Sequence, residues 1–149
     1  MGKSLSEIAG TINVTAGSSV LINENGLIFK DGAQINGNMI FSTLPLNQNA
    51  FIQNGSLHFI PSQKLGEIDQ TGSFSAHGLT AFVGPHMSFK GHVIAALNVY
   101  AGDQVSMHMN GDKLMGVDIT DKVHAHNIDV NDVTGSHITI TAAMAEEAV

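Results

Sequence analysis

Two stretches, GSFSA (Gly72–Ala76) and GHVIA (Gly91–Ala95), follow one plan: a glycine, then residues suited to burial two and four places on. The sequence positions of their glycines differ by 91 − 72 = 19. Alternation of this kind marks a strand with one buried face. A glycine before the strand tolerates the positive φ of a tight corner. The pair therefore predicts short strands that repeat at a fixed spacing.

The same plan follows three earlier glycines, Gly10, Gly37 and Gly55. After each of the two late strands comes a second apolar run, Leu79–Val83 and then Leu97–Tyr100. We therefore expect two strands in each repeat.

Each second run closes on a turn sequence, Gly84-Pro85 or Gly102-Asp103, and the positions of these glycines differ by 102 − 84 = 18. Two strands and two turns in roughly 19–20 residues make one coil of a solenoid. Helix-turn-helix repeats and propeller blades are longer, at about 34 and about 40–45 residues. The regular leucines of a leucine-rich repeat cannot be aligned. The spacing therefore favours an all-β fold, a parallel β-helix of about seven coils forming a single domain over residues 1–149.

Composition excludes several classes of function. The formal net charge is −7, and the six basic residues are all lysines, spread singly along the chain. Nucleic-acid binders need clustered Lys and Arg, so we expect no nucleic-acid partner. The chain has no cysteine, which excludes disulfides and thiolate zinc sites. No stretch approaches the roughly 20 apolar residues of a membrane helix, so we expect no membrane insertion.

One longer stretch resembles a known family. Residues Val20–Asn36, VLINENGLIFKDGAQIN, are similar to the signature LINPNGILFGKGAQVN of the filamentous haemagglutinin family, large exported proteins of two-partner secretion systems. The resemblance covers roughly residues 8–120 and has four further parts: Ser42–Leu44, Gly66–Gly72, Val83–Pro85 and Ala101–Asp103.

The resemblance implies a right-handed parallel β-helix that acts as a non-catalytic secretion and adhesion module. Its partner would be an outer-membrane transporter, with a host-surface glycan or protein as a further partner. The resemblance also implies a secreted or cell-surface location; we expect no enzyme activity and no cofactor. The family domain begins upstream with a signal peptide and a capping region, so we expect this chain to be a middle portion, truncated at both ends. Two alternatives stay open: a carbohydrate-binding or carbohydrate-active β-helix, and a structural fragment that self-associates by stacking its bare ends.

The family's Asn-Pro-Asn-Gly motif corresponds to Asn23, Glu24, Asn25 and Gly26, with Glu24 in place of the proline. Asn-Gly is the strongest tight-turn dipeptide, because the turn needs positive φ. We therefore predict a turn at this secretion motif and take direct contact with the transporter as a second role.

The histidines raise the question of a metal site. His124 and His126 would point to one face of a strand and could bind zinc if Asp129 or Asp121 came close. We favour the simpler interpretation, an exposed irregular segment without a metal. The other six histidines are interpreted as single surface or turn residues: His58, His77, His86, His92, His108 and His137.

Late aspartates raise the question of a carbohydrate-active groove, in which acids gather on adjacent coils. The candidates are Asp103, Asp112, Asp118, Asp121, Asp129 and Asp132, with Lys113 or Lys122 as the base. Most occupy turn positions, where Asp is expected for its backbone hydrogen bonds. We therefore do not predict an enzyme.

Residues 121–149 are expected to continue the solenoid. Ile138–Ala143 indicates the start of a further coil, and Ala142–Ala148 predicts a short terminal helix that caps it.

Overall fold

The computed structural model describes residues 6–47, 56–62, 64, 66–78, 80–102, 104–110, 113–120 and 127–144. The regular elements of this part of the chain are all β-strands, which confirms the all-β prediction. No helix that could span a membrane occurs among the described residues. The strands are β1 (Ser6–Ile8), β2 (Thr11–Ile22), β3 (Leu27–Phe29), β4 (Ala33–Ser42), β5 (Ser56–Phe59), β6 (Ile68–Gln70), β7 (Ser73–His77), β8 (Thr80–Gly84), β9 (His86–Ala101), β10 (Gln104–Asn110), β11 (Lys113–Thr120) and β12 (Asn127–Met144).

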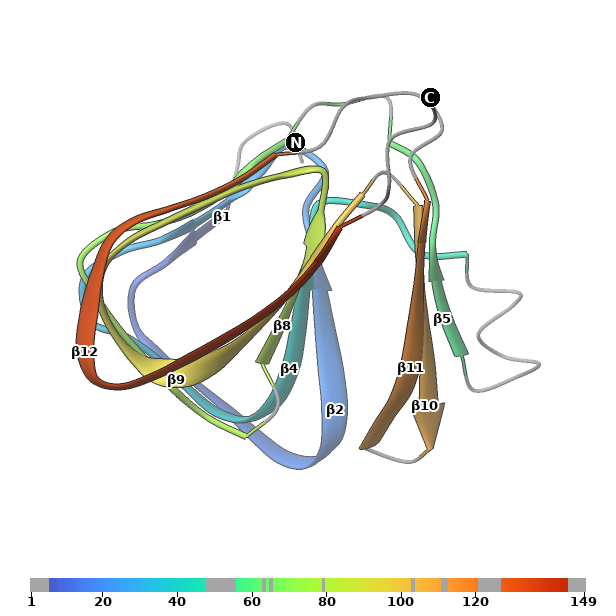
Figure 1. Ribbon diagram of the computed structural model, residues 1–149. Helices are drawn as coiled ribbons and strands as arrows, with labels where there is room; N and C mark the ends of the chain where they lie inside the picture. Colours follow the sequence, from blue (N-terminus) through green and yellow to red (C-terminus); the bar gives the residue numbers. More distant parts are fainter. Residues whose placement is uncertain are drawn as a thin grey trace.

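Strands distant in the sequence pair in parallel, in three series. The first series contains β1, β3, β6 and the first parts of β9 and β12. The second contains the first parts of β2 and β4, then β7 and the middle of β9 and of β12. The third contains the ends of β2 and β4, then β8 and the ends of β9 and β12. The long strands bend from one series into the next, and Figure 1 shows β2, β4, β9 and β12 curving over one another.

The interval in sequence between paired residues varies along the first series, and it is 27 − 6 = 21 between β1 and β3. Ile68 pairs with Met87, and the interval of 87 − 68 = 19 is the one that the sequence predicts. Leu27, however, pairs with Ile68 at an interval of 68 − 27 = 41, and Met87 pairs with Ile128 at the same interval (128 − 87 = 41). The chain leaves the stacked strands after β4 and again after β9. Each series therefore holds five strands among the described residues, and the expectation of about seven coils is wrong.

The two excursions build a second sheet, in which β10 pairs antiparallel with both β5 and β11. Figure 1 shows β5, β10 and β11 standing beside β2, β4 and β8. The strand that follows Gly55 was expected to belong to a coil. It is instead β5, paired with β10 through Phe59 and Val105, so that expectation is wrong. Its alternating pattern is correct, since Leu57 and Phe59 are buried, but they face a different core.

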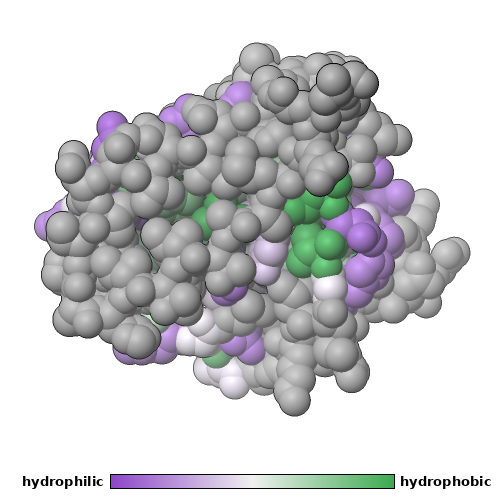
Figure 2. Space-filling model, in the orientation of Figure 1, coloured by the Kyte–Doolittle hydropathy of each residue, from purple (hydrophilic) through white to green (hydrophobic). Residues whose placement is uncertain are grey.

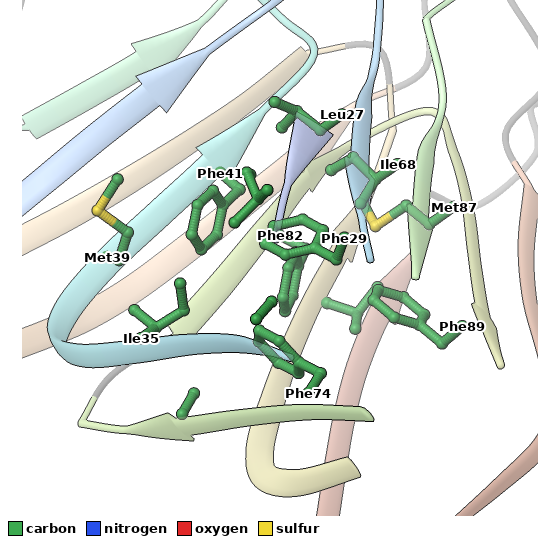
Figure 3. Close-up of a cluster of buried hydrophobic side chains, with 14 residues drawn as sticks. Leu27, Phe29, Ile35, Met39, Phe41, Ile68, Phe74, Phe82, Met87 and Phe89 are labelled. Atoms are coloured by element: carbon green, nitrogen blue, oxygen red, sulfur yellow. The ribbon is translucent and has the colours of Figure 1, made fainter. Parts of the chain in front are cut away.

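Phenylalanines fill the space between the three series (Figure 3). The ring of Phe82 lies 5.5 Å from that of Phe29, 5.5 Å from that of Phe41 and 5.2 Å from that of Phe89, between centroids. Phe29 and Phe41 meet edge to face at 4.7 Å. Such pairs contribute about 0.5–1.5 kcal/mol each beyond the burial of their area. Because every series contributes side chains to this cluster, the first core holds the three series together.

One interior position of the first series is polar. Gln70 lies in register between Phe29 and Phe89 and is 1% exposed. Its Nε2 donates to the carbonyl oxygen of Gly72 at 3.1 Å, while its Oε1 has no partner among the described residues. A buried acceptor left unpaired costs about 1–3 kcal/mol. The amide therefore stabilises the corner before β7 at the expense of the core around it.

A second core lies between the third series and the antiparallel sheet. Outward side chains of the third series, such as Ile40, Val83 and Tyr100, form one cluster with Phe59 and Met107. Their neighbours in the chain point the other way, into the first core. The strands of the third series are thus buried on both faces, which accounts for the consecutive apolar residues Ala81–Val83 in β8. Figure 2, in the orientation of Figure 1, shows hydrophilic residues where β5 and β10 lie, beside apolar ones.

The repeated glycines mark two different corners. Gly10 and Gly72 directly precede the second series, as Thr11 and Ser73 begin β2 and β7. Gly37 instead lies within β4 where it bends into the third series, with φ of +112°, and Gly78 packs on it. The sequence pattern of a glycine before a strand therefore occurs at two different places in the structure, before the second series and before the third.

The turns predicted at Gly84-Pro85 and Gly102-Asp103 form one stacked corner. β8 ends at Gly84, and the Gly102 N–H donates to the Gly84 carbonyl oxygen at 3.1 Å. The third layer of this corner is Thr43, whose N–H donates to the Val83 carbonyl oxygen at 3.1 Å. Asp103 itself lies outside the described residues.

The tail continues the stacking, as predicted, because Ile138–Ala143 pairs in parallel with Ala95–Tyr100. The terminal helix predicted over Ala142–Ala148 is wrong for Ala142–Met144, which belong to β12. Residues 145–148 lie outside the described part. Alanine has a high intrinsic helix propensity, but pairing with β9 overrides it.

Substitution of Gly37 by alanine should strongly destabilise the protein. A Cβ at this position would collide with the carbonyl oxygen of Val14, and the positive φ adds strain. We expect Gly37→Ala to lower the free energy of unfolding by at least about 2 kcal/mol, measured by urea denaturation. Gly10→Ala is the matched control, since a Cβ there meets nothing within 4 Å. Equal losses in the two variants would contradict the assignment of Gly37 to a crowded corner.

Alkaline pH should weaken the fold through Tyr100. Burial raises the pKa of its phenol above the ordinary value of 10.0. The folded state then keeps a proton that the unfolded chain has lost, so stability is complete below about pH 10 and falls as pH rises through the raised pKa. Tyr100 is the one tyrosine and the chain has no tryptophan, so a tyrosinate absorbance titration reports this phenol alone. Tyr100→Phe should lose less stability at alkaline pH than the wild type; identical pH profiles would contradict the prediction.

Candidate functional site

The predicted secretion motif forms a tight turn between β2 and β3. The Gly26 N–H donates to the Asn23 carbonyl oxygen at 3.1 Å, and Gly26 has φ of +132°. That conformation is why a glycine follows Asn25. The turn predicted at Asn23–Gly26 is therefore confirmed.

Asn23 ties this turn to the strands around it. Its Oδ1 accepts from the Asn25 N–H at 2.9 Å, the side-chain bond of an Asx turn. Its Nδ2 donates to Ser6 Oγ at 2.8 Å, and its backbone N–H donates to the Ser42 carbonyl oxygen at 3.0 Å. An amide side chain can make both side-chain bonds because it offers an acceptor and a donor on separate atoms. Asn23 thus joins the turn to the layer before it and the layer after it.

Glu24, which replaces the family's proline, has a partner of its own. Ser62 Oγ donates to Glu24 Oε1 at 2.7 Å, and the Lys64 N–H donates to Ser62 Oγ at 3.0 Å. Ser62 is 8% exposed and lies where the chain returns from β5 towards β6. A proline could not make this bond. The carboxylate of Glu24 therefore anchors the end of the first excursion to the motif.

The turn is enclosed by backbone on two sides. On one side, the Ser6 N–H donates to the Gly26 carbonyl oxygen at 3.0 Å. On the other, Gly66 passes so close that a Cβ there would collide with the Glu24 carbonyl oxygen. Gly26 is buried as a result, while Asn23, Glu24 and Asn25 remain half-buried. A partner could reach only the outer edge of these three side chains.

The proposed metal ligands are largely outside the described residues. His124, His126 and Asp121 lie there, and Asp129 is described only as part of β12. Among the residues that the structure describes, no group of three or more His, Asp or Glu side chains could hold a metal ion.

Some of the late aspartates lie outside the described residues and others within them. Asp103, Asp112 and Lys122 lie outside the described residues, whereas Asp132 and Lys113 are described only as strand positions. Asp118 is described in full, and its carboxylate lies 3.0 Å from His108 Nε2 at the surface. Asp118 is thus directed to a histidine instead of a second carboxylate.

Two histidines interpreted as isolated lie together on the second sheet. The rings of His58 and His108 are 6.5 Å apart between centroids, at an interplanar angle of 83°. His58 Nδ1 lies 2.9 Å from Ser106 Oγ, and His108 contacts Asp118 as described above. The expectation of single residues is therefore wrong for this pair. Alternation with buried Val105 and Met107 along β10 indicates an outward position for His108, but no local pattern shows that β5 places His58 beside it.

Comparison of the chain with protein-family models finds no match, and no curated protein matches it either. The resemblance to the filamentous haemagglutinin family therefore rests on the residues quoted for it.

Loss of the Asn23 amide should loosen the turn. We expect Asn23→Ala to lower the free energy of unfolding by about 1–3 kcal/mol, because two side-chain hydrogen bonds are lost at a half-buried position. Asn23→Asp is the matched control, since it keeps the acceptor for Asn25 and loses the donor to Ser6. Its loss, measured in the same urea titration, should be smaller. A wild-type midpoint for Asn23→Ala would show that the amide contributes nothing.

Proposed function

We propose that this chain is a right-handed parallel β-helix serving as a non-catalytic secretion and adhesion module like those of the filamentous haemagglutinin family. Support for the fold comes from the three series of parallel pairs and the shared aromatic core. Parallel strands of one sheet are joined by right-handed crossovers in about 98% of cases, which favours the right-handed sense.

The observation that carries the functional proposal is the folding of residues 20–36. The stretch that resembles the family signature forms one continuous segment of the stack. It contains the end of β2, the Asn23–Gly26 turn, β3, a second turn and the start of β4. The second turn is closed by the Ala33 N–H, which donates to the Lys30 carbonyl oxygen at 3.2 Å. In the first turn, hydrogen bonds to Ser6 and Ser62 hold the side chains of Asn23 and Glu24, so the outer edge of that turn has a defined shape.

A transporter in the outer membrane is the partner that this proposal names. It would recognise the motif edge at Asn23–Asn25, and the chain would fold after passage to the cell surface. In this role the motif is a turn and a recognition element together. The pairing of Glu24 with Ser62 indicates how a chain without the family's proline keeps the same corner.

Export of a reporter fused to this chain tests the proposal. With a signal peptide fused ahead of the chain and a two-partner transporter in the outer membrane, the wild-type fusion should reach the medium. Asn23→Asp and Asn25→Ala should reduce its export about tenfold or more if the transporter reads these side chains. Asn13→Ala, which alters an exposed asparagine outside residues 20–36, should export normally.

Stability must be measured in parallel, because a misfolded fusion would also fail to appear. Thermal unfolding of the purified variants separates the two causes. Equal export of the motif variants and the wild type would reduce the motif to a turn. A wild-type fusion that no two-partner transporter exports would contradict the secretion proposal itself.

A further inference from the structure

In β2, β4 and β7, the outward side chains of the second series are hydroxyl, amide and imidazole groups, and the register continues from Ser75 to Ile94 of β9. These polar side chains lie in two rows that run across the strands, as the parallel register places them. One row is Thr11, Gln34 and Ser75, and the other is Asn13, Asn36 and His77. Four of the six are exposed, and Asn36 and Ser75 are half-buried. We name these six residues the neutral face.

One hydrogen bond within each row orders four of the six side chains of the neutral face. Thr11 Oγ1 donates to Gln34 Oε1 at 3.2 Å, and Asn36 Nδ2 donates to Asn13 Oδ1 at 2.9 Å. Successive members of a row are about 4.8 Å apart, the spacing of paired strands. An amide offers two donor hydrogens and two acceptor lone pairs, and each of these bonds uses one of them. The rows therefore present ordered donors and acceptors to the outside.

The other outward faces of the stack differ from this one. In the first series the corresponding row includes Glu7 and Asp69, and Lys30 pairs with Glu7 at 2.6 Å. The outward side of the third series is covered by the antiparallel sheet. Of the three faces in the described part, the neutral face alone is both uncovered and free of Asp, Glu, Lys and Arg.

We propose that the neutral face binds an uncharged, extended glycan. Hydroxyl groups along such a chain can exchange hydrogen bonds with successive rows. An anionic polymer is disfavoured, because the face carries no lysine and the chain has a net charge of −7. A protein partner is disfavoured too, because the six residues of the neutral face include none of the large aromatic and aliphatic anchors that dominate protein interfaces.

This inference rests on the adhesion half of the proposed function, since it names the ligand class and the surface for attachment. It does not require export, because the purified chain carries the whole face. A failure to bind glycan would leave the export experiment unaffected, and the reverse also holds.

Affinity electrophoresis tests the proposal with defined polymers. The purified chain is run in native gels containing dextran, hydroxyethyl cellulose or galactomannan, and in gels containing hyaluronate or heparin. We expect at least one neutral polymer to retard the wild type, and neither anionic polymer to do so.

Variants then locate the site. The double substitution Asn13→Ala and Asn36→Ala should weaken the association with that polymer at least about tenfold. Gln34→Ala, at an exposed position where folding is least affected, should weaken it as well. Ser88→Ala, on the outward face of the first series, is the matched control and should bind like the wild type.

Three results would overturn the proposal: no neutral polymer retards the chain, an anionic polymer alone retards it, or the face variants bind like the wild type. Thermal unfolding of each variant accompanies the gels. If the double variant unfolds early, Gln34→Ala alone decides the outcome.

Discussion

Close approach of the backbone at the corners is the constraint on which this molecule depends. Parallel strands pair in register only if successive corners stack, and several corners leave no room for a Cβ. Gly37 packs on Val14, Gly78 on Gly37, and Gly66 on the turn at Glu24. Side chains are thereby excluded from these three points of contact between layers, and the strands between the corners are free to vary in their outward chemistry.

Each outward face can therefore differ while the backbone stays the same. The first series shows charged groups such as Glu7 and Asp69, and the second shows amides and hydroxyls. The third shows apolar groups, which the antiparallel sheet of β5, β10 and β11 covers. One core of phenylalanines serves all three faces, so the outer chemistry can change without repacking the interior.

Local patterns in the sequence predict many of the strands, the 19-residue interval at which β6 and β7 pair with β9, and the turn at Asn23–Gly26, because alternation, glycine and Asn-Gly act over a short length of chain. They do not predict what a buried face packs against. Leu57 and Phe59 alternate like a coil strand and belong to the second sheet instead. In the same way, Ser6 and Ser62 complete the motif from distant parts of the sequence, a separation that no local pattern spans.

The antiparallel sheet has a consequence for the order of folding. β5 comes from the first excursion, whereas its partner β10 comes from the second, so Phe59 cannot pair with Val105 until β6 to β9 have been made. When the chain folds from its N-terminus as it emerges on the far side of the membrane, Leu57, Phe59 and Ile40 stay exposed to water until β10 arrives. Long-range pairing of this kind slows folding and leaves apolar surface exposed to aggregation. A chain whose export halts between β9 and β10 therefore exposes one apolar side of the stack to aggregation, and β10 covers that side.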